Sequence, residues 1–412
     1  MSQGALAHIK VLDLSRVLAG PWCTQILADL GADVVKVERP GVGDDTRHWG
    51  PPFLKDEQGN DTSEASYFSC TNRNKRSITL DLVKPQAQTL LRQLVLQSDV
   101  LVENFKVGGL KAYGLDYESL KALNPRLIYC SITGFGQTGP YAQRAGYDLM
   151  IQATSGMMSI TGRGDDVPGG GPQRVGVALT DLFTGVYAST AILAAIEARR
   201  QTGAGQHIDM ALLDVGMAIL ANQGTGFLNS GQVPKRQGNS HPSLAPYQDF
   251  VTADGSMLLA IGNDGQFARF SEAVGQPQWA KDPRFASNTL RVRHRLALVE
   301  LIEAVTAKRS TAQWIALLED RAVPCGAIND LEQAFADEQV QARKLVLEQK
   351  RGCNEPGSAD TIATIASPLR LAENPAVLRY APPALGQHTD EVLAELGLDA
   401  QQMAALKLQG VV

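Results

Sequence analysis

The sequence has few of the residues that build metal centres and disulfide frameworks. Its 412 residues include five cysteines and six histidines, all widely spaced, with no C-x-x-C and no H-E-x-x-H motif. This pattern argues against a metal site and against a secreted disulfide scaffold. It favours reduced thiols, and we expect a cytoplasmic protein without a bound metal.

The sequence also lacks an excess of basic residues and a long apolar run. Lysine and arginine number 38 against 43 acidic residues, for a net charge of −5, whereas nucleic-acid-binding proteins show a basic stripe. No uninterrupted apolar run reaches the roughly 20 residues of a membrane-spanning helix. The N-terminus has no basic segment followed by an apolar core. We therefore expect neither a nucleic-acid partner nor a membrane association.

The opening of the chain predicts an α/β fold. Strands at residues 9–14 and 33–38 flank a helix at 20–30, which is typical of a parallel βαβ unit. The turn after the first strand lacks G-x-G-x-x-G, and no G-x-x-x-x-G-K-[ST] occurs, so NAD-binding and P-loop functions are disfavoured. Further elements of the same sheet are predicted at 77–80, 100–102, 127–132 and 206–210, with helices at 85–97 and 212–228.

The composition changes after residue 229. Residues 230–242 are polar and rich in turn formers, which indicates a domain boundary. Beyond it, two extended segments flank Asp254-Gly255, a hairpin signal. We expect a second domain of mixed helices and strands, in keeping with a length that suggests two domains.

A basic stretch at residues 72–77 interrupts an otherwise acidic chain. Most such charges belong to a solvated surface. The alternative is a seat for a phosphate-bearing ligand.

Asp181 stands at the entrance of the longest charge-free segment. An apolar run at 175–179 leads into Thr180 and Asp181, and no further charge follows until Glu197, which predicts a buried helix. One interpretation makes Asp181 an ordinary helix N-cap. The other makes it a carboxylate nucleophile, kept ionised by the free N–H groups of the helix start. Spacing alone leaves both interpretations open.

Seven motifs of the sequence fall on residues 12–21, 35–47, 72–77, 102–105, 134–140, 146–148 and 177–181. Together they resemble the class III CoA-transferases, the relatives of formyl-CoA and carnitine CoA-transferases. The similarity covers essentially the whole chain, and within the family the sequence is most similar to the succinyl-CoA transferases that act on glutarate-type dicarboxylates. The closer similarity rests on residues 44–53, 143–147 and 244–247.

This resemblance implies a fold, an assembly and a reaction. It implies a Rossmann-like large domain with a parallel sheet, formed by residues 1–229 and 329–412, a smaller α+β domain at 230–328, and an interlocked homodimer. It implies transfer of CoA from an acyl-CoA to a small carboxylic acid through an aspartyl anhydride and an aspartyl-CoA thioester. CoA then enters as a substrate, and no cofactor is tightly bound.

The resemblance also assigns site residues. The nucleophile falls on Asp181, a role compatible with capping. A dicarboxylate acceptor needs a cation for its far carboxylate, and the candidates in motif-bearing loops are Arg47, Arg144 and His241. The CoA-binding positions fall on Leu18, Ala19, Arg39, Leu80, Asp81, Asn104, Phe105, Lys106, Lys111, Tyr147 and Asp148.

Two other functions compete with CoA transfer. The family also contains α-methylacyl-CoA racemases, but Tyr147 occupies the position of their histidine, and a tyrosine of ordinary pKa, near ~10, is a poor base at neutral pH. A non-catalytic acyl-CoA binding protein would use Asp181 only as a cap. Turnover and a covalent adduct distinguish these hypotheses.

Overall fold

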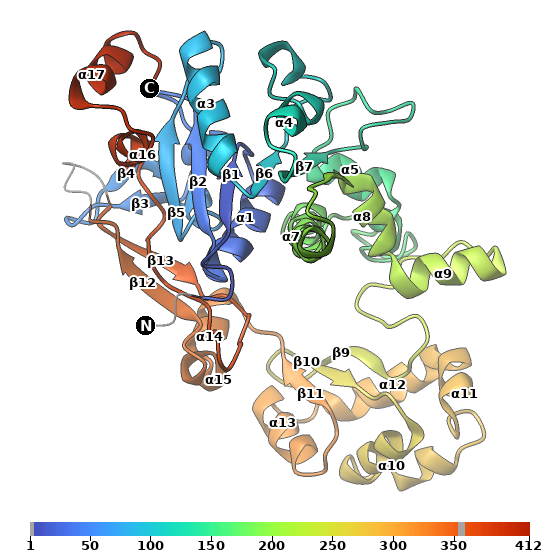
Figure 1. Ribbon diagram of the computed structural model, residues 1–412. Coiled ribbons are helices and arrows are strands. Elements are labelled where there is room, and N and C mark those ends of the chain that lie inside the picture. Colours follow the sequence, from blue (N-terminus) through green and yellow to red (C-terminus); the bar gives the residue numbers. More distant parts are fainter. Residues whose placement is uncertain (1–3, 353–358) are drawn as a thin grey trace. The chain divides into compact units, whose positions relative to one another are not determined.

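The computed structural model describes residues 4–352 and 359–412. The chain divides into two compact units (Figure 1). The first unit comprises residues up to 155, 176–225 and 342–412, and the second comprises 156–175 and 226–341. The segment 156–175, assigned by the sequence to the large domain, thus packs with the second unit, and the chain returns to the first unit at 342 rather than 329. Cys353 lies outside the described residues.

A six-stranded parallel sheet organises the first unit. Its spatial order is β5-β2-β1-β6-β7-β8, and every neighbouring pair runs parallel. The α/β class and all six predicted strands are confirmed, with shifts of one or two residues at the ends. The strands are β1 (Lys10–Asp13), β2 (Asp33–Glu38), β5 (Lys75–Thr79), β6 (Val100–Glu103), β7 (Ile128–Thr133) and β8 (His207–Ala211).

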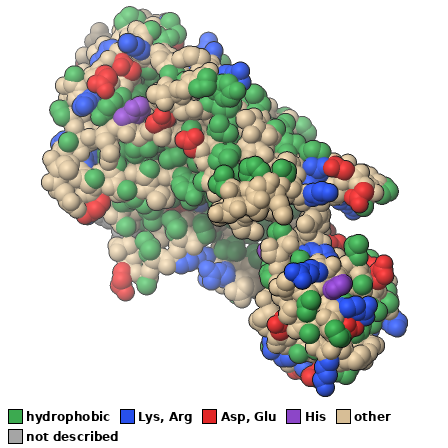
Figure 2. Space-filling view, turned by 90° about the vertical axis from the view of Figure 1, so that its right-hand side faces the viewer, with side chains coloured by type: hydrophobic (Ala, Val, Ile, Leu, Met, Phe, Trp, Pro, Cys, Tyr) green, Lys and Arg blue, Asp and Glu red, His purple; other side chains and the backbone are tan. Residues whose placement is uncertain are grey.

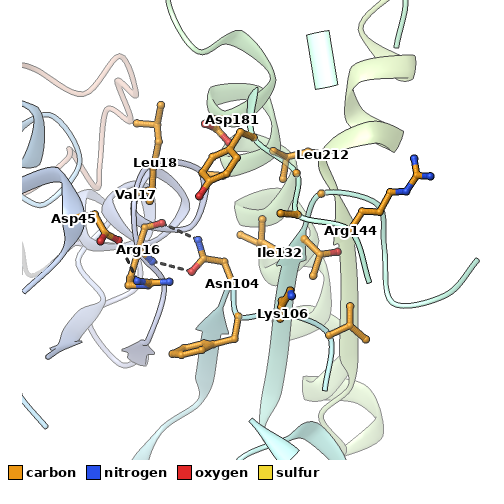
Figure 3. A pocket seen from close by; sticks show the side chains of 18 of the residues that line it. Arg16, Val17, Leu18, Asp45, Asn104, Lys106, Ile132, Arg144, Asp181 and Leu212 are labelled. Carbon is orange, nitrogen blue, oxygen red and sulfur yellow. Dashed lines mark hydrogen bonds and ion pairs between the residues drawn. The ribbon is translucent and has the colours of Figure 1, made fainter. Parts of the chain in front are cut away.

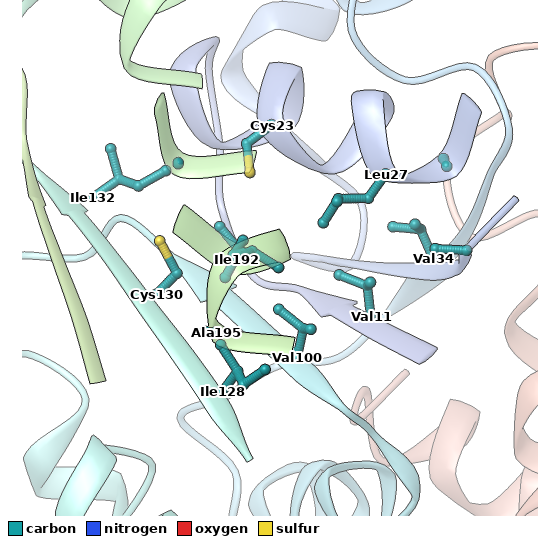
Figure 4. Close-up of a cluster of buried hydrophobic side chains, with 14 of the residues drawn as sticks. Val11, Cys23, Leu27, Val34, Val100, Ile128, Cys130, Ile132, Ile192 and Ala195 are labelled. Atoms are coloured by element: carbon teal, nitrogen blue, oxygen red, sulfur yellow. The ribbon is translucent and has the colours of Figure 1, made fainter. Parts of the chain in front are cut away.

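Helices cover both faces of this sheet, because successive strand residues point to opposite sides. Val11 and Val100 pack under α1 (Ala19–Asp29) and α7 (Leu179–Thr202), as Figure 4 shows. Leu12 and Leu101 face the opposite way, towards a cluster that includes side chains from four other helices. These are α3 (Pro85–Gln97), α4 (Tyr117–Leu123), α16 (Thr389–Glu395) and α17 (Ala400–Leu408).

Smaller elements complete the first unit. Two antiparallel hairpins and several short helices lie outside the main sheet. They are η1 (Asp45–His48), β3 (Phe53–Lys55), β4 (Asp61–Ala65), α2 (Ser66–Ser69), η2 (Lys111–Tyr113), α5 (Asp148–Thr154), α8 (Leu212–Ala218), β12 (Val346–Lys350) and β13 (Thr361–Ile365).

Helix α7 is the central helix of the unit. It is long and apolar enough to cross a membrane by length and composition. Ala188, Ile192 and Ala195 nevertheless pack into the core between α1 and the sheet. A Cβ on Gly185 would lie 2.7 Å from the carbonyl oxygen of Ala19, so the two helix backbones approach closely where Gly185 faces the start of α1. The predicted helix is therefore found and begins two residues before Asp181, but only part of it is buried, with Phe183, Val186 and Tyr187 exposed.

The second unit is built around a three-stranded antiparallel sheet, β11-β10-β9. The predicted hairpin at Asp254-Gly255 joins β9 to β10. Phe250, Met257 and Trp314 belong to its apolar core. The elements are α6 (Met157–Ile160), β9 (Tyr247–Val251), β10 (Ser256–Ala260), α10 (Asp264–Ala273), η3 (Pro277–Lys281), α11 (Asn288–Arg293), α12 (Arg295–Thr306), α13 (Thr311–Glu319), β11 (Cys325–Ala327), α14 (Leu331–Ala336) and α15 (Glu338–Ala342).

Two sequence predictions were wrong. The helix predicted at 212–228 is broken into α8 and α9 (Ala221–Ser230), because Ala221 adopts a φ of 45°.

The basic stretch 72–77 is neither a solvated surface nor a ligand seat. Its cations are buried and paired: Arg73 with Asp29, Lys75 with Asp13, and Arg76 with Asp33, Glu391 and Glu395.

Candidate active site

A cavity of about 570 Å³ opens in the first unit where several strands of the parallel sheet end (Figure 3). Its walls come from residues 16–19 after β1, 104–107 after β6 and 132–134 at the end of β7, with Leu212 just beyond β8. The carboxyl ends of parallel strands are the usual place for ligands in open α/β sheets. The remaining walls include Asp181 and the 142–147 loop.

Asp181 brings a carboxylate into this cavity from the first turn of α7. Burial, aided by the negative charge of Asp148, raises the pKa of Asp181 to about 7. No side chain or backbone group of the described residues donates a hydrogen bond to its carboxylate. Asp181 is thus a partly buried, unpartnered acid that is close to half-ionised at neutral pH.

The capping interpretation of Asp181 was wrong, because Asp148 caps α7. One carboxylate oxygen of Asp148 accepts hydrogen bonds from the Thr180 N–H at 2.8 Å and the Thr180 hydroxyl at 2.6 Å. The other oxygen accepts one from Gln152 at 2.7 Å. Asp148 is 8% exposed. With its carboxylate occupied in this way, it serves the helix start and does not line the cavity as a CoA contact.

Several residues assigned to CoA by resemblance are brought together here. Phe105 and Arg16 line both this cavity and a second one of about 550 Å³, so the two cavities adjoin. The first cavity is lined by Leu18, Ala19, Asn104, Phe105, Lys106 and Tyr147, and the second by Arg39, Leu80 and Asp81. Together they form an elongated site with Asp181 at one end.

Lys111, also assigned to CoA by resemblance, lines neither of these two cavities. It lines a third cavity of about 270 Å³, together with Glu103 and His207. Lys106 lines this cavity as well as the first one. The structure therefore gives Lys106, and not Lys111, a place in the wall of the Asp181 cavity.

Arg47 is a structural residue, which contradicts its assignment to substrate. It is 4% exposed, and its guanidinium pairs with Glu38 and Glu64, both at 2.8 Å. The guanidinium carbon also lies 3.5 Å from the centre of the Phe68 ring. Glu38, Glu64 and the Pro383 carbonyl take four of its five N–H groups, which binds the guanidinium into the protein rather than to an acceptor acid.

Arg144 and His241 lie in different units. Arg144 lines the Asp181 cavity, stacks at 3.8 Å on Tyr141, and forms no ion pair among the described residues. In Figure 3 its side chain extends away from Asp181. His241 belongs to the second unit, where its Nδ1 accepts a hydrogen bond from the Ser243 N–H at 3.0 Å.

Trp49 and Val17 are among the residues of the cavity wall to which the sequence analysis gave no site role. Trp49 lines the cavity and meets Tyr67 edge to face at 5.5 Å. Val17 lines it too, with a φ of 72°. Trp49 lies within a quoted motif, and its aromatic side chain was a usable signal. Val17 also lies within a quoted motif, but nothing in the sequence predicts its left-handed conformation, because β-branched residues rarely adopt positive φ.

Comparison with known proteins identifies the family of the chain. The model of CoA-transferase family III matches residues 6–389. A succinate–glutarate CoA-transferase from Agrobacterium fabrum is 51% identical over 95% of both chains. A succinyl-CoA:glutarate CoA-transferase from Homo sapiens is 41% identical over 99% of this chain and 90% of its own. A crystal structure of a CaiB/BaiF family protein from Brucella suis superposes with a TM-score of 0.82 at 48% identity, over 96% of this chain and 99% of that chain.

The family match extends over most of the chain, and the relatives align over nearly their full lengths. The chain belongs to CoA-transferase family III.

Proposed function

We propose that this protein transfers CoA from succinyl-CoA to a glutarate-type dicarboxylate, with Asp181 as the nucleophile. The observation that carries the proposal is the unpartnered Asp181 carboxylate in the wall of an elongated cavity. The names of the relatives from Agrobacterium fabrum and Homo sapiens support the donor and the acceptor.

The reaction runs as two mirror-image half-reactions. The Asp181 carboxylate attacks the thioester carbon of succinyl-CoA, which forms a mixed anhydride and releases the CoA thiolate. The thiolate then attacks the aspartyl carbonyl, which forms an aspartyl-CoA thioester and releases succinate. The acceptor carboxylate reverses these steps and restores Asp181. Splitting one difficult exchange into easier covalent steps is the advantage of nucleophilic catalysis.

The environment of Asp181 suits this chemistry. Partial burial limits the access of water, which would hydrolyse an anhydride. The same burial destabilises the carboxylate and makes it more reactive than an exposed aspartate. Its position in the first turn of α7 favours negative charge through the helix dipole. The CoA moiety would extend from this end towards Arg39, Leu80 and Asp81 in the adjoining cavity.

For the far carboxylate of the acceptor we propose Arg144, because it lines the cavity and has no competing carboxylate partner among the described residues. Arg144→Ala should raise the KM for the acceptor acid and also that for succinyl-CoA, whose succinyl group carries the same far carboxylate, and leave the melting temperature unchanged. His241→Ala serves as the comparison, since both residues were candidates. Unchanged acceptor KM in Arg144→Ala would remove this residue from the site.

We also propose an interlocked homodimer of Rossmann-like large domains. Apolar side chains that a soluble monomer normally buries are exposed on the first unit, among them Phe183, Val186 and Tyr187 of α7 and Leu149 and Met150 of α5. Figure 2 shows such apolar patches on the molecular surface. Exposed apolar patches of this kind mark interaction surfaces. A monomer in light scattering at micromolar concentration would refute the dimer. The cytoplasmic location stays a prediction.

Mass spectrometry after incubation with succinyl-CoA tests the nucleophile. Hydroxylamine added to the incubation should trap an adduct on the peptide that carries Asp181, and Asp181→Asn should form none. Discharge of the adduct by added glutarate would support the acceptor. A wild-type protein that binds CoA but forms no adduct with several acyl-CoA donors would favour the binding-protein or racemase functions.

A further inference from the structure

The loop between β1 and α1 has a conformation that its sequence does not favour. Val17 adopts a φ of 72°, a left-handed conformation that is costly for a β-branched side chain. Among the non-glycine residues of positive φ in the described part of the chain, Val17 alone is β-branched. Such a conformation persists only where the surroundings hold it, and it occurs preferentially at functional sites.

Two buried, oppositely charged side chains hold this loop from one side. The Val17 N–H donates to both carboxylate oxygens of Asp44, at 3.2 Å each. Asp44 pairs with Lys36 at 3.0 Å, and both side chains are 0% exposed. The Lys36 ammonium also donates to the carbonyl oxygen of Ser15 at 2.8 Å. One ion pair therefore holds two backbone groups of the loop.

Side chains from β1 and from the turn after β6 bind the backbone of the loop at Ser15 and Arg16. The Asn104 amide accepts from the Arg16 N–H at 2.9 Å and donates to the Arg16 carbonyl at 2.7 Å. Asp13 accepts from the Ser15 N–H at 2.9 Å. The backbone from Ser15 to the N–H of Val17 is thus fastened by side chains rather than by neighbouring strands or helices.

The electrostatics of the pair agree with a permanent ion pair. Attraction to Lys36, with hydrogen bonds from Thr46, outweighs burial and lowers the pKa of Asp44. Attraction to Asp44 and Asp13 raises the pKa of Lys36 against the opposing effect of burial. Asp44 borders the second cavity and not the one that holds Asp181. The pair therefore contacts the loop and the second cavity, and not the cavity that holds Asp181.

The fastened loop forms part of the wall of the Asp181 cavity. Residues 16–19 line the cavity together with Asp181. The carbonyl oxygen of Ala19 approaches α7 at Gly185, one turn beyond Asp181. A change at Val17 therefore moves the wall of the cavity that holds the nucleophile. Positioning at this precision matters, because small misplacements of reacting groups cost large factors in rate.

We propose that the buried Lys36–Asp44 pair is a positioning device that holds Val17 in its left-handed conformation and so places the 16–19 loop against Asp181. Lys36, Asp44 and Val17 are positioning residues and do not touch the reacting atoms. The proposal rests on Asp181 being the nucleophile.

A double-mutant cycle in the full-length protein tests this coupling. Asp44→Asn should lower kcat for succinyl-CoA-dependent transfer by about 30-fold and raise the KM for succinyl-CoA by a smaller factor, since the same loop carries Leu18 and Ala19 into the cavity wall. Glycine adopts positive φ freely, so Val17→Gly should make support from Asp44 less necessary. Val17→Gly alone should cost about threefold in kcat through a looser loop, and adding Asp44→Asn to it should cost no more than about fivefold further.

Ala322→Gly is the matched control. Ala322 also has a positive φ, 52°, but it lies in the second unit, after α13. This substitution relieves backbone strain of the same kind and should leave the effect of Asp44→Asn on kcat at its full size. Rescue by Val17→Gly and not by Ala322→Gly would establish that the loop conformation, and not general stability, carries the effect.

Equal kcat losses from Asp44→Asn in the wild-type and Val17→Gly backgrounds would overturn the proposal. If Asp44→Asn does not accumulate as a folded protein, Lys36→Met/Asp44→Asn removes both charges together and enters the same cycle. Asp181→Asn is assayed in parallel. Retained transfer in that variant would refute the proposed nucleophile, whereas absence of rescue by Val17→Gly refutes only the positioning role.

Discussion

Replacing Asp181 by asparagine should make the protein more stable above pH 7 while abolishing transfer. The folded state raises the pKa of Asp181 from 3.8 to about 7. A raised pKa means that the folded state binds a proton more tightly than the unfolded state. Stability therefore falls as the pH rises from about 4 to about 7, and the whole penalty is present above pH 7. Asn carries no charge and escapes this penalty.

The size of this gain in stability follows from how far folding raises the pKa of Asp181. A difference of about 3 pKa units corresponds to about 4 kcal/mol. Because the side chain retains some contact with water, solvent screening reduces this, and we expect a gain of about 2 kcal/mol for Asp181→Asn at pH 8. Below about pH 4 both side chains are neutral, so the two proteins should have the same free energy of unfolding.

Urea denaturation at several values between about pH 4 and pH 8, followed by tryptophan fluorescence, measures this difference. The slope with denaturant should be the same for both proteins, so that the midpoints can be compared directly. Asp166→Asn, at an exposed aspartate of the second unit, is the control and should show no such pH-dependent gain. A variant that is no more stable than the wild type at pH 8, or whose gain is equal at pH 4 and pH 8, would refute this account of Asp181.

Three further predictions follow from the same contacts. For succinyl-CoA, kcat/KM should fall with slope one below about pH 7, since the attacking form of Asp181 is the carboxylate; a flat profile from about pH 5.5 to 8 would contradict this. Asp148→Asn should move the acidic limb of the kcat/KM profile to lower pH, because it removes the charge that helps to raise the pKa of Asp181. Asp148→Ala should lower the free energy of unfolding by about 1–2 kcal/mol through loss of the α7 cap. Denaturation midpoints measure this loss. Arg47→Ala should cost about 3–5 kcal/mol by leaving Glu38 buried without its ion-pair partner, whereas Glu64 keeps Arg351; a fully stable variant with a raised acceptor KM would return Arg47 to the substrate site.

The sequence was sufficient where the physics is local. The βαβ pattern and the extended segments after it predicted the six strands, and the long charge-free segment predicted the helix α7. The Asp254-Gly255 turn predicted the β9–β10 hairpin. These signals need no partner from elsewhere in the chain. Motif similarity also identified the acid at the start of α7, because the motif spans that acid and its local surroundings.

Tertiary structure decided which charges are functional. From the sequence alone, Arg47 and the 72–77 cations were equally eligible as ligand contacts. Each forms ion pairs with acids from other parts of the chain, such as Glu64 for Arg47 and Glu391 for Arg76. Burial of a charge requires such a partner, and a sequence does not show which charges become partners.

The same limit applies to the nucleophile itself. The sequence placed Asp181 at a helix start, where an aspartate normally caps. Only the fold brings Asp148, 33 residues earlier, to the N–H groups of that helix. With the cap supplied from outside, the Asp181 carboxylate is left without a hydrogen-bonding partner among the described residues, and its pKa rises. The residue type was determined by the sequence, but its reactivity depends on which groups the fold places around it.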